Sequence, residues 1–131
     1  MRFFSFHLMP YPDLPPDYDG PAWITCPNEF FDPRLGGELY NRYIDELVYA
    51  EELGFDGVWG FDHFQPMYGD GPGETFEGMT TLAALSGLTS KIRLGLLVTG
   101  ATYRHPSVLA AQALTIDHAS PSTRPPVPSR T

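Results

Sequence analysis

The sequence predicts an α/β fold in which short strands alternate with helices and pair in parallel. Three apolar runs with strand character lie at residues 2–9, 55–61 and 92–99. Each run is followed by a segment with helical signals, at residues 37–54, 75–90 and 106–120. Alternation of this kind is typical of a parallel sheet covered by helices.

The first strand, RFFSFHLM at residues 2–9, ends before Pro10. Its apolar residues hardly alternate with polar ones, so we expect this strand to be buried on both faces. Residues 10–37 contain many prolines and glycines without a helical period. We expect them to form a loop at the carboxyl ends of the strands.

The helical segments carry different signals. Apolar side chains recur every three or four positions in residues 37–54, and Gly54 provides a stop. The predicted buried stripe of this helix consists of Leu39, Tyr43, Leu47 and Ala50, with Ile44 and Val48 beside it. The residues expected to face inward in the second helix are Met79, Leu82, Ala83 and either Leu85 or Leu88. Pro106 suits the first turn of the third helix.

Composition restricts the possible functions. The 131-residue chain is long enough for one ordinary domain, and its formal net charge of −8 argues against nucleic acid as a partner. Cys26 is the single cysteine, so an internal disulfide framework is excluded. No segment approaches the roughly 20 apolar residues of a membrane-spanning helix. We therefore expect a soluble, cytoplasmic protein without a nucleic-acid or membrane partner.

Polar clusters follow each predicted strand, where parallel α/β folds bind their ligands. His7 lies near the end of the first strand, Asp62 and His63 follow the second, and residues 99–105 follow the third. His63 could polarise a carbonyl group or accept a proton, although an Asp-His pair could also merely cap the next turn. Thr99 and Gly100 offer a hydroxyl group and open backbone amides.

Tyr103, Arg104 and His105 could bind an anion or simply cover the start of the third helix, and Arg104 can form bidentate pairs with carboxylate or phosphate. A metal site is a weaker interpretation of the ligand-type residues His7, Asp62, His63, Glu74 and His105. Their spacing matches no recognisable metal motif, so we expect no metal and keep a metal-dependent hydrolase only as an alternative. The sequence also lacks the glycine patterns of Rossmann and P-loop nucleotide sites.

Two segments, ELGFDGVWGFDHFQP and TTLAALSGLTSKIRLGLLVTGATYRHPSVLAAQALTIDHAS, resemble the luciferase-like monooxygenase superfamily. The resemblance is closer to the branch that uses the deazaflavin coenzyme F420. The N-terminal segment FSFHLMPYPDLPPDYDGPAWITCPNEFFDP resembles instead members that use FMN. The resemblance thus implies coenzyme F420 as the cofactor, with FMN as the alternative.

The same resemblance implies the N-terminal portion of a TIM (β/α)8 barrel, with about three βα units. In the family, an Asp-His pair at this position faces the cofactor ring. Asp62 would then help to anchor the cofactor, and His63 would orient or polarise the reacting group. The family's third strand carries a bulge, often with a non-prolyl cis peptide, which would fall at Leu97 and Val98, before Thr99 and Gly100.

The resemblance further implies an oxidoreductase that moves two electrons between its cofactor and a small organic substrate, in a homo-oligomeric parent enzyme. A closed barrel of this type needs about 250 residues. We therefore expect residues 1–119 to form a partial barrel domain and residues 120–131 to be a disordered, non-native or frameshifted tail. A catalytically inactive truncated fragment is the alternative interpretation.

Overall fold

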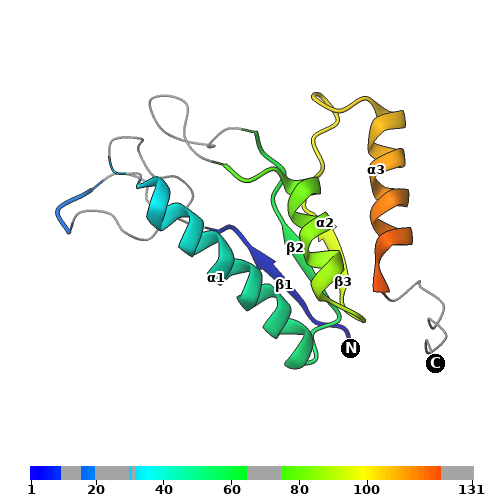
Figure 1. Cartoon of the computed structure of the whole chain (residues 1–131), viewed down its shortest axis with the longest axis horizontal. Coiled ribbons are helices and arrows are strands. Elements are labelled where there is room, and N and C mark those ends of the chain that lie inside the picture. Colours follow the sequence, from blue (N-terminus) through cyan, green and yellow to red (C-terminus); the bar gives the residue numbers. More distant parts are fainter. Residues whose placement is uncertain (10–15, 20–29, 31, 65–74, 122–131) are drawn as a thin grey trace, which may run out of the picture.

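The predicted alternation of strands and helices is confirmed (Figure 1). The computed structural model describes residues 1–9, 16–19, 30, 32–64 and 75–121. The elements in chain order are β1 (Phe4–His7), α1 (Pro33–Glu52), β2 (Gly57–Gly60), α2 (Gly78–Leu88), β3 (Arg93–Leu96) and α3 (Pro106–Ala119). Most of the predicted loop at 10–37 and the tail from residue 122 lie outside the described residues.

The three strands form one parallel sheet in the order β1-β2-β3. Phe4 pairs with Gly57, which pairs with Arg93, and His7 pairs with Gly60, which pairs with Leu96. Helices α1 and α2 lie side by side along the sheet, and α3 stands beside α2 (Figure 1). This arrangement is the parallel sheet with helical cover that the sequence predicts.

The core lies between the sheet and the first two helices. Its buried members are Ile44, Leu47 and Ala50 of α1, Val58 of β2, Leu85 of α2, and Ile92 before β3. The predicted stripe of α1 is confirmed, since Leu39, Tyr43 and the three α1 core residues are buried and Val48 is partly buried. Gly54 has a φ of +84°, a conformation that suits glycine at a helix end.

The expectation that β1 is buried on both faces is wrong. Phe4 is 41% and Phe6 46% exposed, whereas His7, whose side chain contacts α1, is partly buried. The reason is that, among the described residues, α1 and α2 cover the face of β1 that carries His7 and leave its phenylalanines open. A run of apolar residues therefore does not by itself indicate cover on both sides.

Two details of the helices also differ from prediction. Helix α1 begins at Pro33 rather than near residue 37, because the Asp32 side chain caps its first turn and Pro33 suits the first helical position. In α2, Met79 and Leu82 are buried as expected and Leu85 rather than Leu88 is the inward leucine, but the expectation for Ala83 is wrong, since Ala83 is exposed like Leu88. Both exposed residues lie on the side of α2 away from the core.

The end of α3 falls at the start of the predicted tail. The backbone amide of Ser120 donates to the carbonyl oxygens of Ile116 and Asp117, which caps the helix. None of the residues of α3 is buried. Within the ranges described above, no helix is both long and apolar enough to cross a membrane.

Candidate active site

The predicted site residues gather at one edge of the sheet. Because the strands are parallel and in register, His7, Gly60 and Leu96 mark the same end of their strands. Asp62 and His63 follow β2, and residues 97–105 follow β3 at this end. We call this region the strand-end rim and define it by residues 61–64, 77 and 97–105.

Asp62 is the most deeply buried residue of the rim, with 2% of its surface exposed. Its carboxylate accepts two hydrogen bonds from the guanidinium group of Arg104, one of them from Nη2 to Oδ1 at 2.7 Å and the other from Nη1 to Oδ2. The backbone amide of Gly100 donates to Asp62 Oδ2 at 3.0 Å. The hydroxyl group of Tyr103 donates to the backbone oxygen of Asp62. Asp62 thus ties the exit of β2 to the segment after β3.

Arg104 also donates to the carboxylate of Glu77. Glu77 caps α2, since its carboxylate accepts hydrogen bonds from the amides of Met79 at 3.1 Å and Thr80 at 2.7 Å. Partial burial opposes the ionisation of Glu77, but hydrogen bonds from Thr80, Met79 and Arg104 outweigh it, so the pKa of Glu77 lies below its ordinary value. Arg104 thus pairs with two carboxylates of the same chain, and the binding of an external anion stays a prediction.

The surroundings of Arg104 and Tyr103 raise the pKa values of both groups. The hydrogen bonds from Arg104 to Asp62 raise the pKa of the guanidinium group, although burial opposes the rise. Burial and the neighbouring Asp62 carboxylate raise the pKa of Tyr103. The rim therefore keeps a charged Arg104 and a neutral Tyr103 hydroxyl group at neutral pH, and both groups donate hydrogen bonds to Asp62.

His63 is half-buried at the rim, next to Asp62 in the chain. Its ring lies 5.5 Å from the ring of Phe61, measured between centroids. Among the described residues, no side-chain or backbone group forms a hydrogen bond with its imidazole ring. The role of His63 as a proton donor or acceptor therefore stays a prediction.

The segment Leu97–Gly100 forms the outer part of the rim. The peptide bond between Leu97 and Val98 is cis, in agreement with what the family resemblance implies. Leu97 is 54% and Val98 71% exposed, and Thr99 and Gly100 are partly exposed. A Cβ atom on Gly100 would collide with the ring of Tyr103, so this position requires glycine. The segment presents apolar side chains and backbone on an open surface.

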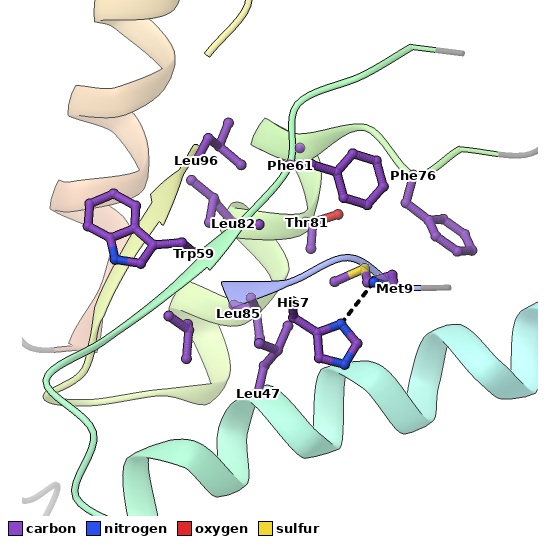
Figure 2. Close-up of a pocket in the computed structure, with 13 residues that line it drawn as sticks. His7, Met9, Leu47, Trp59, Phe61, Phe76, Thr81, Leu82, Leu85 and Leu96 are labelled. Carbon is purple, nitrogen blue, oxygen red and sulfur yellow. Dashed lines mark hydrogen bonds between the residues drawn. The ribbon is translucent and has the colours of Figure 1, made fainter. Parts of the chain in front are cut away.

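His7 turns toward α1, away from the outer rim (Figure 2). Its Nδ1 accepts a hydrogen bond from the amide of Met9 at 2.9 Å, so Nε2 carries the proton of the neutral ring and donates it to Glu46 at 3.2 Å. The ring also contacts Tyr43, at 4.8 Å between centroids. The described partners of the His7 ring are therefore Met9, Tyr43 and Glu46, and none of them belongs to the strand-end rim.

A small cavity lies beside His7, between the sheet and the first two helices (Figure 2). Its walls are mainly apolar and include Leu47, Phe61, Phe76 and Leu85. The cavity volume is about 20 Å³, which is room for about one water molecule. A cofactor ring does not fit in this cavity.

No group of three or more His, Cys, Asp or Glu residues suited to a metal ion occurs in the part of the chain that the structure describes. His105, one of the ligand-type residues, caps α3, since its Nδ1 accepts from the Ser107 amide at 3.3 Å. Glu74 lies outside the described residues.

Sequence reasoning missed Glu77 as a member of the rim, and it placed Tyr103 in the cluster at residues 99–105 without its contact to Asp62. Glu77 is separated from Arg104 by 27 positions, and Tyr103 from Asp62 by 41. The sequence does carry a signal for Glu77. It is an acidic residue directly before the predicted second helix, at a position where its carboxylate can accept hydrogen bonds from the first amides of the helix. For Tyr103, the neighbouring Gly100 marks a close approach of two segments, but it does not indicate which side chain approaches.

Comparison with known proteins agrees with this geometry. A profile of the luciferase-like monooxygenase family matches residues 22–122. Among curated relatives, the F420-dependent glucose-6-phosphate dehydrogenase of Microbacterium testaceum is 41% identical over 71 residues, which are 53% of this chain and 21% of the relative. The enzyme of the same name from Intrasporangium calvum is 40% identical over 85 residues, covering 65% of this chain and 23% of the relative.

A third relative, the F420-dependent hydroxymycolic acid dehydrogenase of Mycobacterium tuberculosis, is 37% identical over 73 residues, covering 56% of this chain and 20% of the relative. The chain thus spans about a fifth to a quarter of the length of these curated relatives. The family profile covers most of the chain, including β2, β3, all three helices and the whole strand-end rim. The chain therefore belongs to the luciferase-like monooxygenase family.

Proposed function

We propose that this chain contributes the cofactor-facing rim of an F420-dependent oxidoreductase that acts on a small organic molecule. The observation that carries the proposal is the open segment Leu97–Gly100, held by buried Asp62 next to an accessible His63. The names of the relatives support a deazaflavin rather than the alternative, FMN. When bound, coenzyme F420 supplies or accepts the pair of electrons.

The residues of the rim fit a flat, partly polar ring. Leu97 and Val98 expose apolar side chains that can contact the face of a ring, and burial of this surface favours binding. Thr99 adds a hydroxyl group, and Gly100 allows the ring of Tyr103 to pack against the backbone of the segment. The carboxylate of Asp62 accepts hydrogen bonds from Arg104 and from the Gly100 amide, so in this proposal Asp62 holds the binding surface in place.

His63 is the residue that we propose to act on the reacting group. Imidazole can donate or accept a proton near neutral pH, and a positioned acid-base group typically contributes about 10²–10⁴-fold to a rate. The ring lies 5.5 Å from that of Phe61, at a tilt of 38°. In this proposal His63 donates a proton to, or accepts one from, an oxygen of the substrate as electrons move.

A chimeric enzyme tests this function. The segment of the Microbacterium testaceum dehydrogenase that matches this chain is replaced by the corresponding residues of this chain, and F420 binding and the reduction of F420 by glucose 6-phosphate are measured. We expect F420 binding within about tenfold of the unmodified relative, because about tenfold corresponds to 1.4 kcal/mol, a small part of a cofactor's binding free energy. A folded chimera that does not bind F420 would contradict the proposal.

A further inference from the structure

We infer that Arg104 is a positioning residue for this reaction, which holds the carboxylates of Asp62 and Glu77 together and thereby fixes the segment Leu97–Gly100 against the exit of β2. The inference rests on the proposed function, because the segment that Arg104 fixes is the proposed cofactor surface. Arg104 is a buried member of the rim, with 5% of its side chain exposed, so it is not placed to touch the cofactor.

The first support is that Arg104 joins three parts of the chain. Asp62 follows β2, Glu77 precedes α2, and Arg104 precedes α3. The exposed fractions of the two carboxylate side chains are 0% for Asp62 and 32% for Glu77. Arg104 therefore pairs with one fully buried acid and one acid at the border with solvent.

The second support comes from the electrostatics of burial. A carboxylate without a partner at the position of Asp62 would be strongly destabilising, because it leaves water for a less polar environment. A guanidinium group offsets this cost, since its planar fork donates two parallel hydrogen bonds to one carboxylate and keeps donors for another. The remaining negative charge is carried by Glu77, where solvent and the positive N-terminus of α2 stabilise it.

The third support is the path from Arg104 to the cofactor surface. Asp62 Oδ2 accepts hydrogen bonds from both Arg104 and the Gly100 amide, so the position of one donor depends on the other. The guanidinium carbon also lies 5.1 Å from the centroid of the Phe64 ring and 5.2 Å from that of Tyr103. These rings flank Arg104 and limit its rotation. Loss of the fork would release Asp62 and, with it, Gly100.

The proposal is tested in the full 131-residue chain with Arg104→Lys, which keeps the positive charge but cannot form the fork. The matched control is Arg42→Lys, because Arg42 pairs with Glu46 on the exposed surface of α1. Amide hydrogen exchange by NMR is measured first, without cofactor. We expect the Gly100 amide to exchange at least roughly tenfold faster in Arg104→Lys, since hydrogen bonds to charged groups contribute more than neutral ones. Amides in the middle of α1 should keep their rates in both variants.

Binding of F420 is then followed by NMR titration of the same samples. We expect the dissociation constant to rise roughly tenfold in Arg104→Lys and to stay unchanged in the control. Unchanged exchange at Gly100 would overturn the inference. Faster exchange with unchanged F420 affinity would also overturn it, because Arg104 would then be structural only. If the wild-type chain does not bind F420, the proposed function is wrong, and so is the role of Arg104 in cofactor binding. The amide exchange rates still decide, independently of F420, whether Arg104 fixes Gly100.

If Arg104→Lys does not fold, the wild-type chain decides the structural part. The Gly100 amide should exchange more slowly than the amide of its neighbour Ala101, because only Gly100 donates to Asp62 among the described amides of this segment. Tyr103→Phe provides a milder variant, which removes the hydroxyl donor to the Asp62 backbone and leaves the fork intact. Equal exchange of Gly100 and Ala101 in the wild-type chain would overturn the inference.

Discussion

Replacement of Glu51 by Gln is expected to loosen the junction between α1 and β3. Glu51 lies in the last turn of α1, and its carboxylate accepts hydrogen bonds from three consecutive amides before β3. The distances are 3.0 Å from the Ser90 amide and 2.8 Å from the Ile92 amide, and the Lys91 amide donates to the same oxygen as Ile92. Gln keeps one acceptor oxygen, but its NH₂ group cannot accept a hydrogen bond from these amides.

The size of the effect follows from the charge of the acceptor. A hydrogen bond to a charged group contributes about 1.5–3 kcal/mol, and Glu51 is only partly buried, so we expect a loss of about 1–2 kcal/mol of unfolding free energy at pH 7. Burial opposes ionisation of Glu51, but the amides of Ile92, Lys91 and Ser90 outweigh it, so the pKa of this carboxyl lies below its ordinary value of 4.5.

The sign of the pH dependence follows from that lowered pKa. The stabilisation is present in full above the ordinary value, where the unfolded chain is also ionised, and it is lost as the pH falls through the folded-state pKa. The difference between wild type and Glu51→Gln should therefore be largest near pH 7 and shrink at about pH 3.

Urea unfolding followed by circular dichroism measures this difference at both pH values. Glu52→Gln is the matched control, because Glu52 is exposed at the next position of the same helix. We expect the control to stay within about 0.5 kcal/mol of wild type. If Glu51→Gln is as stable as Glu52→Gln at pH 7, or if the gap is the same at both pH values, the reasoning is refuted.

Three other predictions concern the site and the core. His63→Ala in the chimeric enzyme should lower turnover by about 10²–10⁴-fold with little change in F420 affinity, and steady-state kinetics that retain turnover within a few-fold would make His63 structural. Gly95→Ala should destabilise the chain by about 1–3 kcal/mol in urea unfolding, because a Cβ atom there collides with the Trp59 ring. Leu85→Ala should cost about 2–5 kcal/mol by the same measurement, since Leu85 is 2% exposed at the centre of the core; a loss below 1 kcal/mol would contradict this burial.

The sequence was sufficient to predict features that depend on local pattern. The stripe of α1 was correct because apolar residues at helical spacing bury one face whatever the neighbouring element is. Pro106 and Gly54 marked a helix start and a helix end for reasons of backbone geometry alone. The gathering of Asp62 and His63 with the segment after β3 followed from parallel topology.

Features that depend on distant partners could not be predicted from residue patterns. The exposure of Phe4 and Phe6 is set by which sheet face the helices cover, and an apolar run carries no information on that point. Arg104 could be identified as an anion-binding residue, but nothing in a single sequence indicates that its anions are Asp62 and Glu77. The cis peptide before Val98 was anticipated through resemblance to a family, not through spacing or composition.

The most direct test of the central claim is an NMR titration of the 131-residue chain with coenzyme F420. The account predicts saturable chemical-shift changes at the His63 ring and at the backbone amides of residues 97–100. It predicts little change at the amides of residues 90–92, which donate to Glu51 at the opposite end of the strands. The same pattern with FMN at much higher concentration would agree with the preference for a deazaflavin. Saturable shifts centred elsewhere, or no saturable shifts at the rim, would contradict the account.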